Sequence, residues 1–449
     1  MKKAIHMKTK KITTPCGAIK GIDFGDYLEF RGIKYATSKR WEYSEEVTAW
    51  DGVYDATEFG DCPCQRRAFE EDAVCNAFYH KEFREGMTFT YSEDCLFLNI
   101  YAPKKVTGAP ILFYIHGGSF TGGSANEGHI SGVEYAKNGV IFVSINYRLG
   151  PYGFCSHPDL RNEDGVCGNF GLYDQFNAIK WVRHNIEAFG GDPNKLTLLG
   201  QSAGAMSVDI QLSNPEAEGW YAGAILMSGA ALQRDVVKPV KPETTKDFWD
   251  TIIKNANVNS IEELREIDEK KLYYAWYDAC QANIMSMVYT LPVVDGKMVT
   301  KETFNMSTIP DIPYVIGVTV TDMFPSILKS ITKSWVRRTK NHKNKTFVYD
   351  FARELPGDDK GAWHACDLLY AFATLNNNWR PFQEVDYEIS NQMVKSFVAF
   401  CKKGDPNCNA LPWWRAGANK VMNFSEKTEF SAWPDAKLIK NTLFNWGSI

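Results

Sequence analysis

The stretch that decides the fold is Leu196-Thr197-Leu198-Leu199-Gly200-Gln201-Ser202-Ala203-Gly204-Ala205-Met206-Ser207-Val208-Asp209-Ile210. Its first four residues form an apolar run typical of a strand, and its last residues favour a helix. Between them, the G-x-S-x-G pattern predicts a strand–turn–helix elbow that exposes the Ser202 hydroxyl at a sheet edge. Gly200 and Gly204 lack a Cβ, so the strand and the helix can approach closely. A helix N-terminus would then place unpaired N–H groups and partial positive charge beside that hydroxyl.

A second glycine motif supports this interpretation over an ordinary turn, in which a serine only hydrogen-bonds locally. His116-Gly117-Gly118-Ser119-Phe120 directly follows the strand-like run Ile111–Ile115. Gly117 and Gly118 can turn backbone N–H groups toward a carbonyl oxygen, as the oxyanion-hole loop of an α/β-hydrolase does, and Ala203 would supply another. A glycine-rich hairpin stays the alternative, whereas a phosphate loop would need a Lys-Ser/Thr pair that does not follow. We therefore expect an oxyanion hole beside a nucleophilic serine.

The general base must follow the serine, because the triad of this fold runs Ser, then Asp or Glu, then His. Of the eight histidines, only His342 and His364 come after Ser202. His342 lies in a basic stretch, residues 337–345, that is typical of a solvated loop. His364 lies between the strand-like run Phe347–Phe351 and an apolar helix, where a base of this fold belongs. We therefore prefer His364.

The acid must lie between the serine and the base, after a strand. Asp322 follows the apolar run Tyr314–Thr319, which predicts a buried strand. Asp295 follows Leu291–Val294 and is the rival, but Gly296 comes next, and Asp-Gly is a turn pair. We therefore expect Asp322 to orient the base and Asp295 to be a turn residue.

Longer motifs recur along nearly the whole chain. They are Phe30–Ala36, Glu93–Tyr101, Asn146–Gly150, Gly168–Gln175, Phe189–Gly204 and Lys403–Asn407. Through them the chain resembles the type-B carboxylesterases, the family that includes cholinesterases and bacterial p-nitrobenzyl esterases. The resemblance implies an α/β-hydrolase fold and a triad of Ser202, Asp322 and His364. It also implies that Ser228, in a Met-Ser-Gly turn, supports the acid; without the resemblance, Ser228 is only a turn residue after an apolar run.

The chain also departs from this family. Gln201 stands where the family usually has Glu, and the acid Asp322 is one methylene shorter than the usual Glu. The turn that carries Asp322 must therefore lie closer to the histidine. The connection from Asp322 to His364 is short, which predicts a trimmed cap and an open site that accepts bulky or aromatic esters. We expect residues 237–310 and 323–345 to form cap segments, without a mobile apolar lid of the lipase type.

Strand-like and helical stretches alternate along the chain. The strand-like runs are Ile111–Ile115, Val140–Ile145, Leu196–Leu199, Gly223–Met227, Tyr314–Val318 and Phe347–Phe351, and the main helical stretches are 172–187 and 385–402. This alternation predicts a central, mostly parallel, doubly wound sheet flanked by helices. Length alone, 449 residues, would allow about three domains. We expect a single α/β-hydrolase catalytic domain over residues 1–449, with helical cap insertions.

Composition limits the other possibilities. A hydrophobic content of 44% suffices for a large core, and a net charge of −4 argues against a nucleic-acid partner. Apolar runs are all shorter than the ~18 residues that span a bilayer, and the basic N-terminus lacks the apolar core of a signal peptide. Eleven cysteines without C-x-x-C pairs predict free thiols and no zinc site. We expect no metal, no cofactor, no membrane partner, a cytoplasmic location, and a monomer or small homo-oligomer.

The function that follows is hydrolysis of small to medium carboxylic esters, short-chain or aryl, through an acyl-enzyme on Ser202. Some of the aromatic residues, 14% of the chain, should line an apolar substrate pocket. Two alternatives stay open at this point. One is an amidase or carbamate hydrolase that uses the same triad, and the other is a non-catalytic, cholinesterase-like interaction protein.

Overall fold

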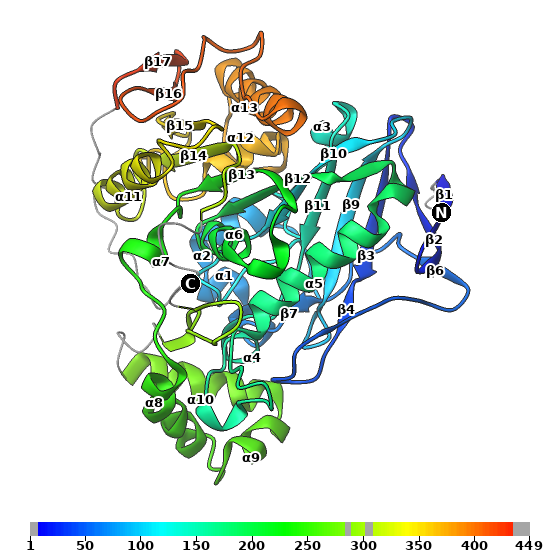
Figure 1. The fold of residues 1–449 in the computed structure, drawn as a ribbon, viewed down its shortest axis with the longest axis vertical. Helices are drawn as coiled ribbons and strands as arrows, with labels where there is room; N and C mark the ends of the chain where they lie inside the picture. Colours follow the sequence, from blue (N-terminus) through cyan, green and yellow to red (C-terminus); the bar gives the residue numbers. More distant parts are fainter. Residues whose placement is uncertain (1–7, 283–288, 301–308, 434–449) are drawn as a thin grey trace.

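A large twisted sheet runs through the molecule (Figure 1). The structure is a computed structural model, and it describes residues 8–282, 289–300 and 309–433. Across the sheet the strands are β1 (Thr9–Thr14), β2 (Gly17–Asp23), β3 (Tyr27–Lys34), β9 (Phe97–Pro103), β11 (Ile141–Ile145), β10 (Ala109–Ile115), β12 (Gly191–Gln201), β13 (Tyr221–Met227), β14 (Tyr314–Thr319), β15 (Thr346–Phe351), β16 (Val421–Phe424) and β17 (Glu429–Ser431), with β6 (Val53–Asp55) beside β2. Neighbours from β11 to β16 pair in parallel, and the pairs that extend this path at either end are antiparallel. The mostly parallel sheet predicted from the alternation is confirmed.

The central strands are buried on both faces, as strands of a parallel sheet covered by helices must be. In β10, Ile111 and Phe113 pack into a core shared with helices on one face, whereas Leu112 and Tyr114 pack into a separate core on the other. The first face is covered by α5 (Phe170–Asn185), α6 (Ala203–Ser213) and α11 (Pro325–Arg338), and the second by α3 (Val133–Lys137), α12 (Asp367–Ala371) and α13 (Glu384–Lys403). Alternate residues of one strand thus stabilise two layers of helices, which is the doubly wound arrangement.

A helical lobe lies to one side of the sheet, at the bottom of Figure 1. It consists of α8 (Pro242–Asn255), α9 (Ile261–Glu266) and α10 (Glu269–Ala282), and it falls within the segment expected to be a cap. Trp249 and Trp276 are buried in its own hydrophobic cluster, which also takes in Phe170 at the start of α5. The lobe is therefore anchored to the sheet domain through an apolar core.

A second excursion from the sheet, the 65–84 segment, lies between the short strands β7 (Cys62–Pro63) and β8 (Tyr91–Ser92), which pair with each other. A further short pair joins β4 (Ala36–Thr37) and β5 (Glu45–Glu46). The 65–84 segment contains the 3-10 turn Arg66–Ala68, α1 (Asp72–Cys75), α2 (Ala77–Tyr79) and the π-turn His80–Arg84. The remaining short helices are α4 (Gly150–Gly153) and α7 (Leu232–Asp235). These brief turns hold polar side chains near the centre of the molecule.

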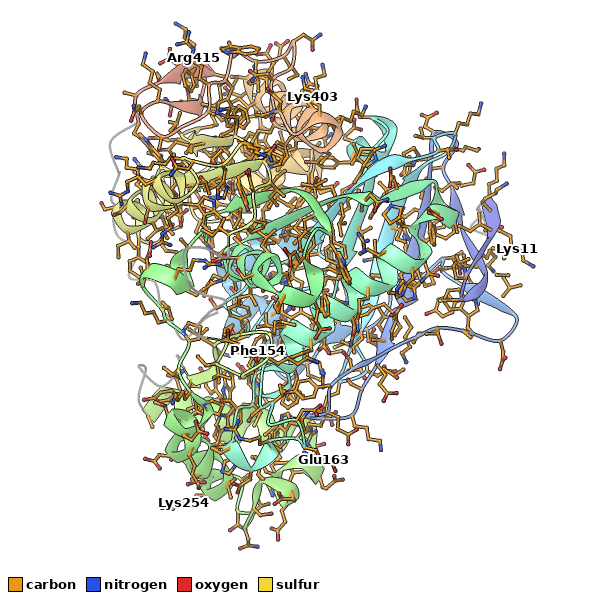
Figure 2. The ribbon with its side chains drawn as sticks, in the orientation of Figure 1. Lys11, Phe154, Glu163, Lys254, Lys403 and Arg415 are labelled. Carbon is orange, nitrogen blue, oxygen red and sulfur yellow. The ribbon has the colours of Figure 1, made fainter. Side chains whose placement is uncertain are left out.

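Most charged side chains lie at the surface of the molecule, and apolar side chains fill its interior. Figure 2 shows Lys11, Lys254 and Lys403 at the periphery, whereas Phe154 lies inside, where 1% of its surface is exposed. Within the described ranges, every helix is too short or too polar to cross a bilayer. All eleven cysteines lie in described residues, and all are free thiols.

Candidate active site

Ser202 occupies a strained turn between β12 and α6. Its φ of 55° and ψ of −124° are values that L-residues with a side chain rarely adopt. A Cβ on Gly200 would lie 2.2 Å from the carbonyl oxygen of Gly204, and one on Gly204 would lie 2.1 Å from that of Ile115. Both positions therefore need glycine. The Ser202 N–H donates to the carbonyl of Met227 at 2.8 Å, which ties the turn to the neighbouring strand β13.

The glycine loop after β10 lies directly against this turn. A Cβ on Gly117 would lie 3.1 Å from the Cβ of Ser202, and Gly118 has a φ of 109°. The loop is held from behind by the Tyr147 hydroxyl, which donates to the His116 carbonyl at 3.0 Å. On the other side of the turn, Ala203 begins α6. The structure thus brings Gly117, Gly118 and Ala203 around Ser202, as an oxyanion hole requires.

Asp322, His364 and Ser228 form a continuous chain of contacts behind the serine. Nδ1 of His364 lies 2.5 Å from Oδ1 of Asp322, and the Ser228 hydroxyl donates to Oδ2 of Asp322 at 2.6 Å. Thr319 Oγ1 and the Met323 N–H also donate to this carboxylate, at 3.0 and 2.7 Å. Ser228, Asp322 and His364 follow β13, β14 and β15, so the carboxyl ends of neighbouring parallel strands bring them together.

The turn that carries Asp322 lies against the loop that carries His364. Thr321 and Trp363 form a parallel bridge between the two loops. The Thr321 N–H donates to the Ala362 carbonyl at 3.2 Å, and the Ala362 N–H donates to Thr321 Oγ1 at 3.3 Å. The residue before the acid is therefore hydrogen-bonded to the residue two positions before the base.

The charges and hydrogen bonds around Asp322 and His364 shift the pKa values of both groups. Burial alone would raise the pKa of Asp322, but the nearby His364 and the hydrogen bonds from His364, Ser228 and Met323 hold it below its usual value. Burial alone would lower the pKa of His364, but the Asp322 charge and hydrogen bond outweigh it, and the pKa is raised. Asp322 is therefore a carboxylate that accepts from Nδ1–H, which leaves Nε2 of a neutral His364 as the basic atom.

Gln201, the residue before the serine, contacts this basic atom. Its amide nitrogen lies 3.2 Å from Nε2 of His364. Among the described residues, no hydrogen bond joins the Ser202 hydroxyl to His364. Ser202, Gln201 and His364 nevertheless line the same cavity.

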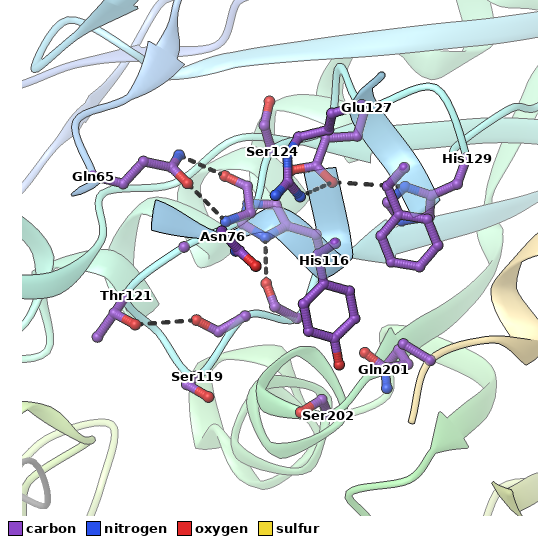
Figure 3. A pocket seen from close by; sticks show the side chains of 18 of the residues that line it. Gln65, Asn76, His116, Ser119, Thr121, Ser124, Glu127, His129, Gln201 and Ser202 are labelled. Carbon is purple, nitrogen blue, oxygen red and sulfur yellow. Dashed lines mark hydrogen bonds and ion pairs between the residues drawn. The ribbon is translucent and has the colours of Figure 1, made fainter. Parts of the chain in front are cut away.

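The opposite side of the cavity is charged. Figure 3 shows Ser202 and Gln201 on one side and Glu127 and His129 on the other. We call four lining residues the charged wall: Arg67, Asp72, Arg84 and Glu127. Arg84 donates to both oxygens of Asp72, at 2.7 and 3.0 Å, and reaches Glu127 at 3.4 Å, while Arg67 forms an ion pair with Glu127.

The charged wall carries fixed charges. Burial alone would raise the pKa of Glu127, but the charges of Arg67 and Arg84 lower it to about 2. Burial lowers the pKa of His129 to about 4, so this imidazole is neutral near pH 7. The expected apolar pocket is therefore only partly present: Tyr79, Phe83, Tyr114 and Leu368 do line the cavity, but so do these charges. The sequence carries no periodic signal for this wall, because its members come from short turns.

The rival residues lie elsewhere. Asp295 accepts hydrogen bonds from the N–H groups of Lys297 and Val299, at 2.8 and 2.9 Å, and from the Asn169 side chain at 2.7 Å, as a turn aspartate does. Nδ1 of His342 lies 4.0 Å from Asp311. Neither Asp295 nor His342 lines the cavity.

The expected cap segments contribute unequally to the cavity. Met323 lines it, whereas none of the described residues of 237–310 does. The 65–84 segment covers the site instead. Where the chain is described, no group of three or more His, Cys, Asp and Glu side chains is placed to hold a metal ion.

Comparisons with known proteins agree with this geometry. The model of the carboxylesterase family matches residues 8–332 and 320–438. The fumonisin B1 esterase of Sphingopyxis macrogoltabida is 40% identical over 223 residues, which cover 48% of this chain and 39% of that protein. The para-nitrobenzyl esterase of Bacillus subtilis is 29% identical over 90% of this chain and 91% of its own. A solved carboxylesterase of Geobacillus stearothermophilus matches with a TM-score of 0.78 and 28% identity, over 94% of this chain and 98% of that one.

Proposed function

Because the chain belongs to the carboxylesterase family and is a carboxylic-ester hydrolase, we propose that Ser202 is its nucleophile, His364 its base and Asp322 the acid that orients the base. The interpretation as a non-catalytic interaction protein is set aside. The observation that carries the proposal is the contact chain from Ser228 through Asp322 to His364, which ends at the cavity that Ser202 lines.

The reaction then proceeds in two halves. Nε2 of His364 takes the proton of the Ser202 hydroxyl while the oxygen attacks the ester carbonyl. The N–H groups of Gly117, Gly118 and Ala203 stabilise the resulting oxyanion, each by about 3 kcal/mol. His364 gives the proton to the leaving alcohol, and water then releases the acid by the same steps. Ser228 acts on the reaction only by holding Asp322.

We infer that the substrates are small to medium esters with a short-chain or aryl part. Tyr79, Phe83 and Leu368 on the cavity surface favour such groups, and the names of two similar proteins refer to a p-nitrobenzyl ester and to fumonisin B1. The charged wall adds a polar surface that a purely hydrocarbon substrate would leave without partners. Esters with hydroxyl or carbonyl groups on that side should therefore be preferred over long alkyl esters. Hydrolysis of aryl amides or carbamates at comparable rates would favour the amidase alternative.

We also propose that residues 1–449 act as a single catalytic domain, with 237–310 and 323–345 as insertions around the site. The support is that the helical lobe shares a hydrophobic cluster with α5, and that Met323 reaches the cavity. The odd number of cysteines without C-x-x-C pairs supports a reducing, cytoplasmic location. A monomer or small homo-oligomer is the expected assembly, which size-exclusion chromatography with light scattering would test.

The test of the nucleophile is covalent labelling. An aryl phosphonate ester should inactivate the protein with one equivalent bound, and peptide mass mapping should place the adduct on Ser202. Ser119 is the internal control, because this serine lines the same cavity and also has a positive φ, of 55°. An adduct on Ser119, or inactivation without an adduct on Ser202, would refute the assignment.

A further inference from the structure

The two ring nitrogens of His364 face partners of opposite hydrogen-bonding character. Nδ1 lies 2.5 Å from a carboxylate oxygen of Asp322, which can only accept, so Nδ1 carries the proton. In a neutral imidazole, Nε2 is then an acceptor with one lone pair. The Gln201 amide nitrogen, 3.2 Å away, is a donor and fits that lone pair. Gln201 therefore binds the base only in its neutral form.

Gln201 has little freedom to move away from this contact. It is the last residue of β12, pairs with Met227 of β13, and has 3% of its surface exposed. The side-chain oxygen lies at the oxyanion loop, because a Cβ on Gly117 would come within 2.7 Å of it. The side chain thus spans from the glycine loop to the imidazole, inside the cavity that Ser202 also lines (Figure 3).

The charged groups that act on His364 work in the opposite direction. The titratable groups that face His364, its loop or Asp322 from the packed elements are Asp322, Asp367, Asp350, Tyr79, Tyr349 and Cys366. The charges of Asp322 and Asp367 both favour the imidazolium. Tyr79 donates only to the backbone carbonyl of His364, at 3.5 Å, and Tyr349 donates to Asp367 at 2.8 Å. On the Nε2 side, Gln201 is the group that favours the neutral ring.

We propose that Gln201 is a positioning residue that holds Nε2 of His364 in the free enzyme and keeps the imidazole in its proton-accepting form at lower pH than a glutamate would. A glutamate side chain has the same length, but its carboxylate can only accept and would stabilise the imidazolium instead. This inference rests on the proposed roles of Ser202 and His364. In the first step of the reaction, the Ser202 hydroxyl replaces the amide at Nε2, because a single lone pair accepts one proton.

The experiment compares the pH dependence of kcat/KM for Gln201→Glu and Gln201→Met with that of the unaltered enzyme. Phenyl acetate is the substrate, because it does not ionise and its phenol product is measured directly. The acid limb of kcat/KM reports the ionisation of the base in the free enzyme. Gln392→Glu is the matched control: Gln392, on α13, accepts a hydrogen bond from the Thr428 hydroxyl, a glutamate can still accept there, and the net charge changes equally.

We expect the acid limb of Gln201→Glu to move up by about one pH unit, so that at the wild-type midpoint its kcat/KM lies about tenfold below its own plateau. Gln201→Met removes the donor without adding charge, so its limb should move up by a smaller amount. Gln392→Glu should leave the limb in place. A merely structural role for Gln201 would lower the whole profile without moving the limb.

A shift of less than half a unit in folded, active Gln201→Glu would overturn the inference. If that variant does not fold, judged by circular dichroism, Gln201→Met decides: a raised limb supports the inference, and a limb at or below the wild-type position overturns it. If the proposed function were wrong, the Ser202→Ala variant would keep its activity. If the phosphonate labels Ser202 but the acid limb of Gln201→Glu does not move, only the role of Gln201 is refuted.

Discussion

The two sides of the cavity are built in contrasting ways. The side that carries Ser202 is assembled at the carboxyl ends of β12 to β15, where adjacent strands end side by side. The charged wall comes from the short turns of the 65–84 segment and from Glu127. Backbone pairing positions the first side, whereas ion pairs between side chains position the second. Reactive groups can therefore be held rigidly by the sheet while the opposite wall varies with its loops.

The two sides also differ in how their charges are matched. In the charged wall, two arginines pair with two carboxylates, so each acid has a permanent cation. On the serine side, the ion-pair partner of the Asp322 carboxylate is an imidazole, and that imidazole meets the neutral Gln201 at its other nitrogen. A proton can therefore move on the serine side at little cost, whereas the charged wall contributes to stability and to the shape of the site.

The largest expected effect lies on the serine side. Ser202→Ala removes the nucleophile, so kcat should fall by about four orders of magnitude or more, as for other serine hydrolases. Ser119→Ala, on the same cavity, should stay within about tenfold. Both are measured as initial rates on phenyl acetate. A Ser202→Ala protein with more than about a hundredth of wild-type activity would contradict the assignment.

The next effect concerns the acid and the base. Asp322→Asn should lower kcat by about three to four orders of magnitude, because an amide cannot hold the required tautomer or stabilise the imidazolium. His364→Ala should lose at least as much, while Asp295→Asn and His342→Ala stay within about tenfold. The reverse pattern, with Asp295→Asn inactive and Asp322→Asn active, would show that the acid is misassigned.

Substitutions in the charged wall should change the free energy of unfolding more than they change kcat. Glu127→Gln leaves the buried Arg67 without its carboxylate partner, which should cost about 3–5 kcal/mol in the free energy of unfolding. Since the pKa of Glu127 falls to about 2 in the folded state, its contribution is complete above the unfolded value of 4.5 and is lost as the pH falls toward 2. Urea unfolding at pH 7 and pH 3 measures this, and the gap between variant and wild type should narrow at pH 3.

The control for that experiment is Glu243→Gln, which breaks an ion pair with Arg161 between exposed side chains. Such pairs contribute at most about 1 kcal/mol. Equal losses of stability for Glu127→Gln and Glu243→Gln would mean that the charged wall is no more than a surface ion-pair network.

The smallest effect tests the helical lobe. Tyr274 of α10 packs on Phe69 and donates to Glu70 at 3.4 Å, and both residues belong to the 65–84 segment that lines the site. Tyr274→Phe removes only that long hydrogen bond, so kcat/KM on phenyl acetate should change less than about twofold. A change of tenfold or more would mean that the lobe controls access to the cavity through this contact.

Several features could be predicted from the sequence because they depend on local geometry. A G-x-S-x-G turn after an apolar run can adopt only a few conformations, and Gly200 and Gly204 are needed wherever such a turn closes against a strand. Alternating apolar runs and helices predict parallel strands, whose carboxyl ends share one edge. The order of the triad along the chain then selected Asp322 and His364, and the resemblance to the type-B carboxylesterases added Ser228; the structure places the three in contact.

The charged wall and the contact of Gln201 with the base were decided only by the tertiary structure. Glu127 lies 60 residues after Arg67 and 43 after Arg84, and no periodic pattern marks the three. Gln201 was visible in the sequence as a departure from the usual glutamate, but its partner atom depends on how the loops after β12 and β15 meet. The physical reason is that local sequence limits the conformation of a turn, whereas the partner of a buried polar group depends on which segments fold against it.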